Sequence, residues 1–423
     1  MKEFELMISD EYVNQDVFNN QILSFVRKRE QEEKVFSLLI DLSRANYVTL
    51  NVMVNLLLLG TYTDSKGIQL RIKLEPVSKL TEYFYDTGFM RTIIDNNVIT
   101  FYGVDPDGTS PTLSIDIGRR KATNIICILS KDNLYDIHSR RYIFKTEDER
   151  TIIRRLLEIE IYGNIDPYGD IHLLNRRIKI NDLFASGNSY TEYVRVISNV
   201  AYTSEYSHTE KRQVKYLDFE RLILYADMLI EVIENSILHG GEMCAVGFQA
   251  YQRKGENPVI EISISDMGPG CYSTIKEKID DDMIFDTFTV SVDEYKNLIN
   301  DNTYNGKLVR DYYSIYESIL CRRKLKKRGI YNIFADLAKM KDVHTRVEYK
   351  NNNVRINFGN NEIRDLLGSV GKSDNIHNIK EKLPIFLRDI KAKNVKSSHK
   401  RKQNLVDHNP DSLPGVNLLI KVS

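Results

Sequence analysis

Between residues 216 and 240, apolar side chains recur at every third or fourth position, a spacing that predicts one long amphipathic helix. The apolar set consists of Leu222, Ala226, Leu229, Ile233 and Ile237. Beside it runs a stripe of polar residues spaced four apart, which places them on one side of the helix. The stripe comprises Asp227, Glu231, Asn235 and His239. It is either a face turned to water or a line of functional groups beside a core.

The chain after this helix alternates apolar and polar residues with a period of two, which is typical of strands. The alternating segments are 244–254 and Val259–Asp266, and the GEN turn between them predicts an antiparallel hairpin. The second segment runs directly into DMGPG, residues 266–270. An acid followed by two spaced glycines at a strand end allows a ligand to approach the backbone closely. The helix and the glycine turn together indicate a binding site.

The N-terminal residues follow an order of strand, helix, strand and helix. The expected strands are 34–42 and 68–74, and the expected helices are 48–59 and 78–88. This order predicts a parallel or mixed sheet covered by helices.

The C-terminal residues predict one helix and further strands. A helix is expected after Gly329, where apolar residues fall at helical spacing. Strands are expected at 345–349 and 353–358, joined by an asparagine-rich turn, and 416–423 is a candidate terminal strand.

The helix and the glycine turn resemble motifs of the GHKL or Bergerat-fold ATPases, a family that includes histidine kinases and gyrase. EVIENSILHG resembles the E-x-x-x-N box, with an ending most similar to anti-sigma-factor serine kinases, and DMGPG resembles the D-x-G-x-G box. The resemblance implies Mg-ATP binding: Asn235 would be the magnesium ligand, and Glu231 the base that orients a water or a substrate hydroxyl. Asp266 would accept a hydrogen bond from the adenine amino group, and Gly268 and Gly270 would open the nucleotide lid.

Residues 271–327 occupy the position of that family's ATP lid, part of which is expected to be helical. The lid ends in a basic run that includes Lys327 and Arg328 and is followed by Gly329. This end resembles the second glycine box of the family, although only one glycine remains where the family has G-x-G. The resemblance implies phosphate binding by Lys327, Arg328 and Gly329, and a helix N-terminus suits that role. A basic surface run that caps a helix is the alternative.

The N-terminal pattern resembles the STAS-like domain of anti-sigma-factor antagonists. The resemblance rests on DLS at 41–43, KGIQLRIKL at 66–74 and TGF at 87–89. The serine that accepts phosphate in that family is missing here. Thr49 is the nearest hydroxyl, and it is expected to be a helix N-cap.

The expected fold class is α/β: a C-terminal Bergerat-type sandwich, with a mixed sheet and helices on one face, plus a smaller N-terminal STAS-like domain. The expected divisions are a STAS-like domain at 1–105, a connector with its own small core at 106–205, a GHKL ATP-binding domain at 206–362 and a basic tail at 363–423.

Composition argues against a polyanionic partner for the whole chain, because 59 Lys and Arg balance 59 Asp and Glu among 423 residues. Basic residues concentrate in 371–402, but only Phe386 could stack on bases there, so nucleic acid is not the expected partner. No apolar run approaches the roughly 20 residues of a membrane span, and a cytoplasmic location is expected. The four cysteines lack metal-ligand spacing and are expected to be reduced.

The expected function is that of an Mg-ATP-binding signalling or switch protein. Through Glu231 it would hydrolyse ATP or transfer phosphate to a protein hydroxyl. Its expected partners are ATP and an unidentified protein, with a homo-oligomer left open. The alternative is a non-catalytic, nucleotide-gated interaction scaffold.

Overall fold

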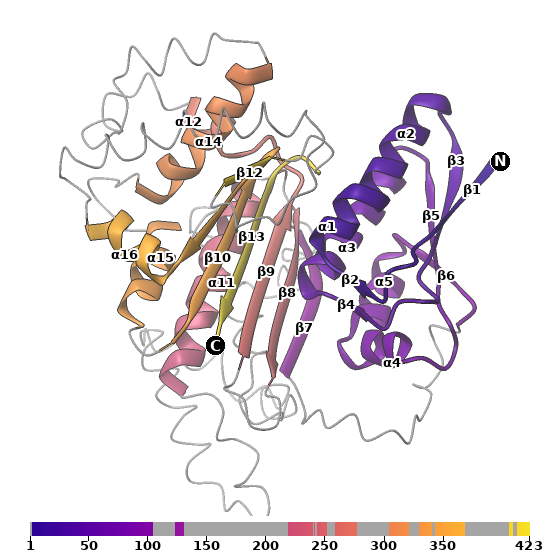
Figure 1. Ribbon diagram of the computed structural model, residues 1–423, viewed down its shortest axis with the longest axis horizontal. Helices are drawn as coiled ribbons and strands as arrows, with labels where there is room; N and C mark the ends of the chain where they lie inside the picture. Colours follow the sequence, from indigo (N-terminus) through magenta and orange to yellow (C-terminus); the bar gives the residue numbers. More distant parts are fainter. Residues whose placement is uncertain are drawn as a thin grey trace, which may run out of the picture.

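The computed structural model describes residues 2–104, 123–130, 219–239, 241, 243–251, 259–276, 304–320, 330–340, 343–368, 406–408 and 413–423. They form a four-stranded parallel sheet and a seven-stranded antiparallel sheet, with helices between the two sheets and on the far side of the larger one (Figure 1). The expected α/β class is confirmed.

The parallel sheet belongs to the N-terminal residues, and its strand order, β1-β3-β5-β6, follows the sequence. Its strands are β1 (Lys2–Met7), β3 (Phe36–Asp41), β5 (Gln69–Lys73) and β6 (Thr100–Tyr102). Two short strands, β2 (Tyr12–Val13) and β4 (Tyr47–Val48), pair separately. The helices are α1 (Gln15–Val17), the π-helix η1 (Phe18–Leu23), α2 (Ser24–Glu32), α3 (Leu50–Ser65), α4 (Lys79–Asp86) and α5 (Phe89–Asn96). Right-handed crossovers place all helices of such a sheet on one face, which here turns toward the second sheet (Figure 1).

The second sheet has the order β12-β11-β10-β13-β9-β8-β7, and every neighbouring pair is antiparallel. Its strands are β7 (Thr123–Ser130), β8 (Met243–Tyr251), β9 (Val259–Asp266), β10 (Thr345–Asn351), β11 (Val354–Gly359), β12 (Val406–His408) and β13 (Val416–Val422). The expected mixed sheet is therefore wrong for the described strands. The hairpins β8–β9 and β10–β11 impose antiparallel neighbours, and β13 lies between the hairpins, antiparallel to both β9 and β10.

Helices cover the outer face of this sheet and share an apolar core with it. They are α11 (Phe219–His239), α12 (Cys271–Lys276), α14 (Tyr304–Leu320), α15 (Ile330–Lys339) and α16 (Asn360–Gly368). Ile262 and Ile264 of β9 lie in this core together with Leu229 and Ile233 of α11. The apolar stripe predicted for the helix thus faces the sheet.

Helix α3 covers the opposite face of the second sheet, so helices lie on both faces and not on one as expected. Every residue from Leu50 to Gly60 is buried, because α3 contacts β5 on one side and β8 and β9 on the other. Gly247 of β8 permits the close approach, since a Cβ there would lie 2.8 Å from Cδ1 of Leu50. Thr49 occupies the N-cap position as expected, but its hydroxyl makes no capping hydrogen bond.

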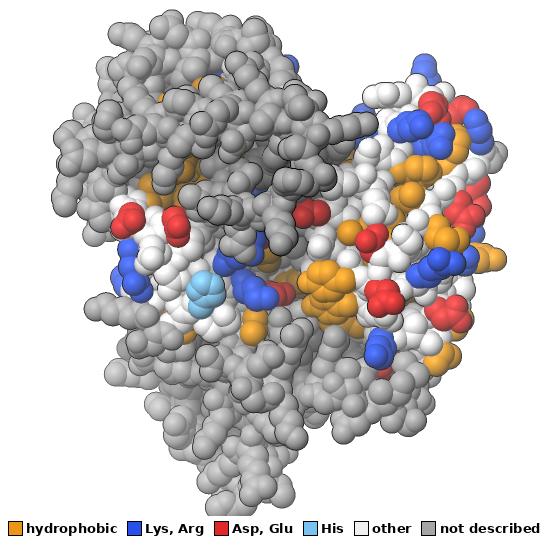
Figure 2. Space-filling model, viewed as in Figure 1, with side chains coloured by type: hydrophobic (Ala, Val, Ile, Leu, Met, Phe, Trp, Pro, Cys, Tyr) orange, Lys and Arg blue, Asp and Glu red, His pale blue; other side chains and the backbone are white. Residues whose placement is uncertain are grey.

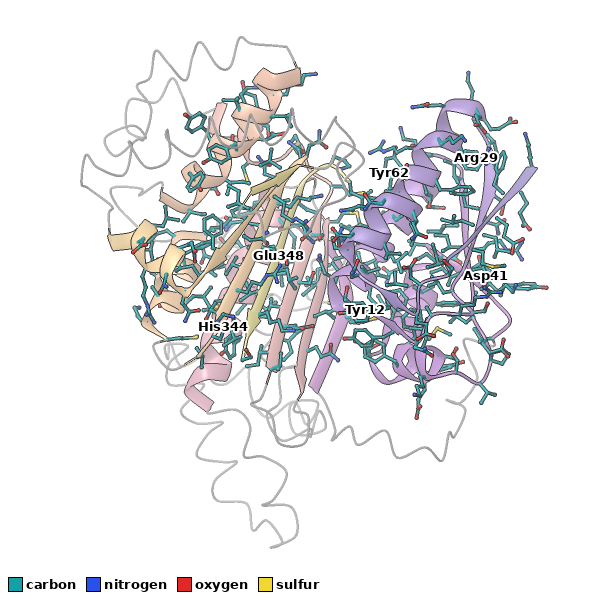
Figure 3. The ribbon with its side chains drawn as sticks, in the orientation of Figure 1. Tyr12, Arg29, Asp41, Tyr62, His344 and Glu348 are labelled. Carbon is teal, nitrogen blue, oxygen red and sulfur yellow. The ribbon has the colours of Figure 1, made fainter. Side chains whose placement is uncertain are left out.

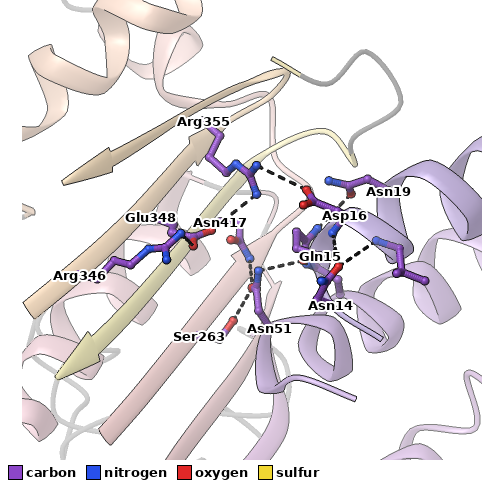
Figure 4. A network of polar contacts seen from close by, with 12 residues as sticks. Asn14, Gln15, Asp16, Asn19, Asn51, Ser263, Arg346, Glu348, Arg355 and Asn417 are labelled. Atoms are coloured by element: carbon purple, nitrogen blue, oxygen red, sulfur yellow. Dashed lines mark hydrogen bonds and ion pairs between the residues drawn. The ribbon is translucent and has the colours of Figure 1, made fainter. Parts of the chain in front are cut away.

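A buried network of neutral polar side chains joins α3 to the second sheet (Figure 4). Ser263 Oγ and Asn417 Nδ2 both donate to Asn51 Oδ1, each at 2.8 Å. Asn51 in turn donates through Nδ2 to Gln15 Oε1, at 2.9 Å. The polar side chains that the two units bury against each other are therefore hydrogen-bonded, as burial requires.

The second sheet takes strands from three of the segments expected from the sequence. The edge strand β7 comes from 106–205, the expected connector, and β12 and β13 come from 363–423, the expected tail. The candidate terminal strand at 416–423 is confirmed as β13, in the middle of the sheet. The expected helix at 216–240 is confirmed as α11, and the hairpin after it as β8–β9.

Paired charges lie on the face of this sheet that turns toward α3, and Glu261 among them is buried. Arg346 contacts Glu348 at 2.7 Å, and Lys421 contacts Glu261 at 2.7 Å. Figure 2 shows basic and acidic side chains interspersed on this face. The described surface on this side therefore presents no large field of one sign, in line with the balanced composition.

Candidate functional site

Two residues of the polar stripe of α11, Glu231 and Asn235, have described side chains. Glu231 is 5% exposed and Asn235 is half-buried, so a stripe that simply faces water is wrong at Glu231. Asn235 Nδ2 donates to the backbone oxygen of Glu231, at 2.7 Å. This bond uses the amide nitrogen, so a metal ion at Asn235 would be bound by the amide oxygen, a ligand that suits Mg²⁺. Asp227 and His239 also belong to α11, but their side chains lie outside the described part of the structure.

The two sequence motifs meet at the end of β9. Ser236, the residue after Asn235 on α11, donates a hydrogen bond to the carboxylate of Asp266. Just after α11, a Cβ on Gly241 would lie 3.8 Å from the Cα of Gly268. The end of helix α11 and the glycine turn are therefore adjacent in space, although they are separate in sequence.

Asp266 is a buried carboxylate held by the backbone. It is 4% exposed, and its Oδ1 accepts hydrogen bonds from the amides of Gly268, at 3.0 Å, and Val416, at 3.1 Å. Burial raises the pKa of Asp266 to about 6, against the opposing effects of these amides, Ser236 and the charge of Lys350. A buried acid with such a pKa is typical of functional sites, although buried structural acids share it.

The DMGPG turn packs against the turn between β10 and β11. Gly270 has a φ of +83°, and a Cβ there would lie 2.5 Å from Asn352 Nδ2 and 2.6 Å from Asn351 Oδ1. Asn351 Oδ1 also accepts the amide of Cys271, at 2.9 Å. Glycine is thus required for two reasons, conformation and space. The close approach that it permits in this structure is to two asparagine side chains of the same chain.

Residues 413–416, here named the C-terminal strap, cross the turn and end in Val416, the first residue of β13. Gly415 has a φ of +91°, and its missing Cβ leaves room for the backbone oxygen of Asp266. The amide of Gly415 donates to Asn352 Oδ1, at 3.0 Å, and its oxygen accepts the Asn352 amide, at 2.8 Å. Lys350 Nζ donates to the oxygen of Leu413, at 2.6 Å.

Two further titratable groups lie beside the strap. Asp311 of α14 is 8% exposed and accepts Asn352 Nδ2, at 3.0 Å, and burial raises its pKa to about 6. Burial lowers the pKa of Lys350 to about 8, and the charges of Asp266 and Asp311 oppose that shift. The site therefore holds two carboxylates away from water beside the half-buried Lys350, an arrangement that costs stability unless the charges compensate one another.

The remaining predicted site residues cannot be placed in this arrangement. Lys327, Arg328 and Gly329 lie outside the described residues, and α15 begins immediately after them at Ile330. Within the described part of 271–327, α14 buries Leu308, Tyr312 and Ile315 in the core shared with the second sheet, which confirms that part of this segment is helical.

The DLS motif of the N-terminal unit forms a structural ion pair away from this site. Asp41 is 1% exposed and contacts Lys73 Nζ at 2.7 Å, and it also accepts the amide of Ser43. Burial alone would raise the pKa of Asp41, but the bonds from Lys73 and Ser43 bring it below its ordinary value. Figure 3 shows Asp41 on the outer part of the N-terminal unit, away from Glu348 on β10.

Four residues of the site were missed from the sequence: Ser236, Asp311, Lys350 and Gly415. Ser236 could have been found from its place beside Asn235, and Gly415 from the Pro-Gly pair that precedes the terminal strand. Asp311 and Lys350 give no motif signal, because only tertiary packing brings them to Asp266.

Comparisons of the chain with protein-family models, with curated proteins and with solved structures found no match. Among the described residues, no group of three or more His, Cys, Asp or Glu side chains is placed to hold a metal ion. No described helix has both the length and the apolar character needed to cross a membrane.

Proposed function

We propose that this chain is an Mg-ATP-binding signalling or switch protein with a GHKL-type, Bergerat-fold nucleotide site between α11 and the DMGPG turn. One observation carries the proposal: the two motifs, separate in sequence, lie together through the hydrogen bond from Ser236 to Asp266. A second supports it, because burying the carboxylates of Glu231 and Asp266 has a cost that function can explain.

Each predicted residue has a role in this proposal. Asn235 binds Mg²⁺ through its amide oxygen, and phosphate oxygens and water complete the coordination, as is usual for this ion. Glu231 orients a water or a protein hydroxyl for attack, and Asp266 accepts the adenine amino group. Gly268 and Gly270 allow the backbone conformation of the turn. The segment containing Lys327, Arg328 and Gly329 binds phosphate.

The N-terminal unit, which we propose to be STAS-like, is the second part of the switch. Its helix α3 contacts β8 and β9, the strands that lead to Asp266. A signal received by this unit therefore has a short physical route to the nucleotide site. A protein partner, a cytoplasmic location and turnover of ATP by hydrolysis or phosphotransfer remain part of the proposal, and a homo-oligomer stays open.

Equilibrium titration with a non-hydrolysable ATP analogue, with and without Mg²⁺, tests this function. The wild type should bind in an Mg²⁺-dependent manner, and Asp266→Ala should weaken binding by about tenfold or more, the effect of losing a buried charged acceptor. Asn235→Ala should remove the Mg²⁺ dependence. Asp41→Asn, at a buried acid of the other unit, serves as the control and should bind as the wild type does.

The second candidate function is a non-catalytic, nucleotide-gated interaction scaffold. One observation favours it: only Gly329 remains where the GHKL family has G-x-G in its second glycine box. Nucleotide binding by the wild type together with unchanged phosphate release in Glu231→Ala would favour this scaffold over an enzyme. Absence of Mg²⁺-dependent binding by the wild type would count against both nucleotide functions.

A further inference from the structure

The C-terminal strap bonds to one oxygen, Oδ1, of the carboxylate that the proposed function assigns to adenine. A carboxylate oxygen has two lone pairs, and those of Asp266 Oδ1 are both used, by the amides of Gly268 and Val416. The Gly268 amide belongs to the glycine turn itself. The Val416 amide comes from a segment far along the chain, and it is the one donor that could leave without disturbing the turn.

The strap is held by a small number of polar contacts and by Leu413, which is 3% exposed and lies in the apolar core of the N-terminal unit. Lys350 Nζ reaches the oxygen of Leu413 at 2.6 Å, and the side chain of Asn352 accepts the amide of Gly415 at 3.0 Å. Asn352 is itself held by Asp311, at 3.0 Å. Lys350 and Asn352 therefore hold the strap in place, and we call this pair the clasp. Asp311, a buried acid of α14, in turn holds Asn352.

The residues of β13 that follow the strap are held by strand pairing and by a buried hydrogen bond. Asn417 pairs with Ser265 in the sheet, and its Nδ2 donates to Asn51 of α3 at 2.8 Å (Figure 4). The rest of β13 pairs on both sides, with β9 and β10. Displacement of residues 413–416 would break the pairing of Val416 with Asn351 at the end of β13, and it can pivot at Asn417 and leave the rest of the sheet paired.

We propose that the C-terminal strap is an autoinhibitory element that bonds to Asp266 through the Val416 amide until nucleotide takes its place. This inference rests on the proposed nucleotide site. An adenine amino group and the Val416 amide are both N–H donors to the same oxygen, so they compete for it. Loosening the clasp formed by Lys350 and Asn352 raises the affinity for nucleotide.

Two variants weaken the clasp without removing β13. Lys350→Met keeps the apolar stem and deletes the donor to Leu413. Asn352→Gly deletes the side-chain contact and suits the backbone, since Asn352 has a φ of +49°. Asn97→Gly is the matched control, because Asn97 has a φ of +50° and lies exposed in the other unit.

Two readouts are needed: residue-resolved amide hydrogen exchange of nucleotide-free protein, and affinity for an ATP analogue with Mg²⁺. Each clasp variant should speed exchange of the Val416 amide by about fivefold, the equivalent of one hydrogen bond, and leave that of Gly268 unchanged. Affinity for the analogue should rise by a similar factor. Asn97→Gly should change neither.

The outcomes separate this inference from the proposed function. Faster exchange at Val416 with unchanged affinity would show that strap and nucleotide do not compete, which overturns the inference and leaves the nucleotide site standing. Tighter binding without faster exchange would also overturn it, because the strap would not be the cause. No nucleotide binding in the wild type or in either variant would overturn both.

Discussion

The two faces of strand β9 are buried in chemically different ways. Toward α11, strand β9 presents Ile260, Ile262 and Ile264, which enter a continuous apolar core. Toward α3 the same strand presents Glu261, Ser263 and Ser265, which are also buried. Alternation along a strand therefore does not always separate a buried face from an exposed one. Here it separates an apolar interface from a hydrogen-bonded one.

The hydrogen-bonded face of β9 restricts how the packed elements can be arranged more than the apolar face does. Besides the contacts of Asn51, Ser265 Oγ donates to Asn55 Oδ1 at 3.1 Å, and Asn55 Nδ2 donates to Gln15 Oε1 at 2.9 Å. Apolar burial stabilises many arrangements of similar volume, whereas a satisfied polar network stabilises one register. The difference indicates that the N-terminal unit is held in one defined position next to the strands that lead to Asp266.

The largest effect is expected on the apolar face. Phe248 of β8 is fully buried in the core shared with α11, so Phe248→Ala should lower the free energy of unfolding by about 3–5 kcal/mol. Urea-induced unfolding measures the change. Tyr102→Ala, at an aromatic residue that is 52% exposed, is the control and should cost far less. An equal loss in the two variants would contradict the assignment of the core.

A smaller loss is expected on the polar face. Asn51→Ala removes its hydrogen bonds with Ser263, Asn417 and Gln15 and leaves the buried Ser263 hydroxyl without its acceptor, so it should cost about 2–3 kcal/mol. A double-mutant cycle of Asn51→Ala with Ser263→Ala should give a coupling energy of about 1 kcal/mol. Additive losses would mean that the network does not act as a unit.

The buried acid at the site predicts a pH dependence. The folded-state pKa of Asp266, about 6, lies above the ordinary value of 3.8, so its contribution to stability is complete below that ordinary value and is lost as pH rises through 6. Asp266→Asn removes this titration. The stability of the variant relative to the wild type should therefore increase by about 3 kcal/mol between acidic and neutral pH. Chemical unfolding across that range measures it, and a difference that does not vary with pH would contradict the burial of an ionised Asp266.

The smallest effects concern the helix caps of the N-terminal unit. Ser78 Oγ accepts the amide of Thr81 at 3.1 Å, whereas Thr49 at the start of α3 makes no such bond. Ser78→Ala should cost about 1 kcal/mol, and Thr49→Ala less than about 0.5 kcal/mol. Thermal unfolding compares the two. A larger loss in Thr49→Ala would mean that α3 depends on its cap and not on its position between two sheets.

Local patterns in the sequence predict the elements of the site well. The period of two in β9 and the apolar spacing in α11 are properties of neighbouring residues, and both elements form as expected. The central position of β13 is different, because it depends on pairing Asn417 with Ser265, far away along the chain. No periodicity encodes such a pairing. For the same reason the sequence predicts Asp266 as an acceptor but not the Val416 amide that reaches it.

The most direct measurement compares the affinities of the wild type for Mg²⁺ complexes of non-hydrolysable ATP and GTP analogues. Adenine presents an amino donor where guanine presents an oxygen acceptor, so a carboxylate at Asp266 distinguishes them. The wild type should prefer the ATP analogue by about tenfold or more, and Asp266→Asn should lose most of that preference. Equal affinity for the two nucleotides, or a preference that survives in Asp266→Asn, would contradict nucleotide recognition at Asp266.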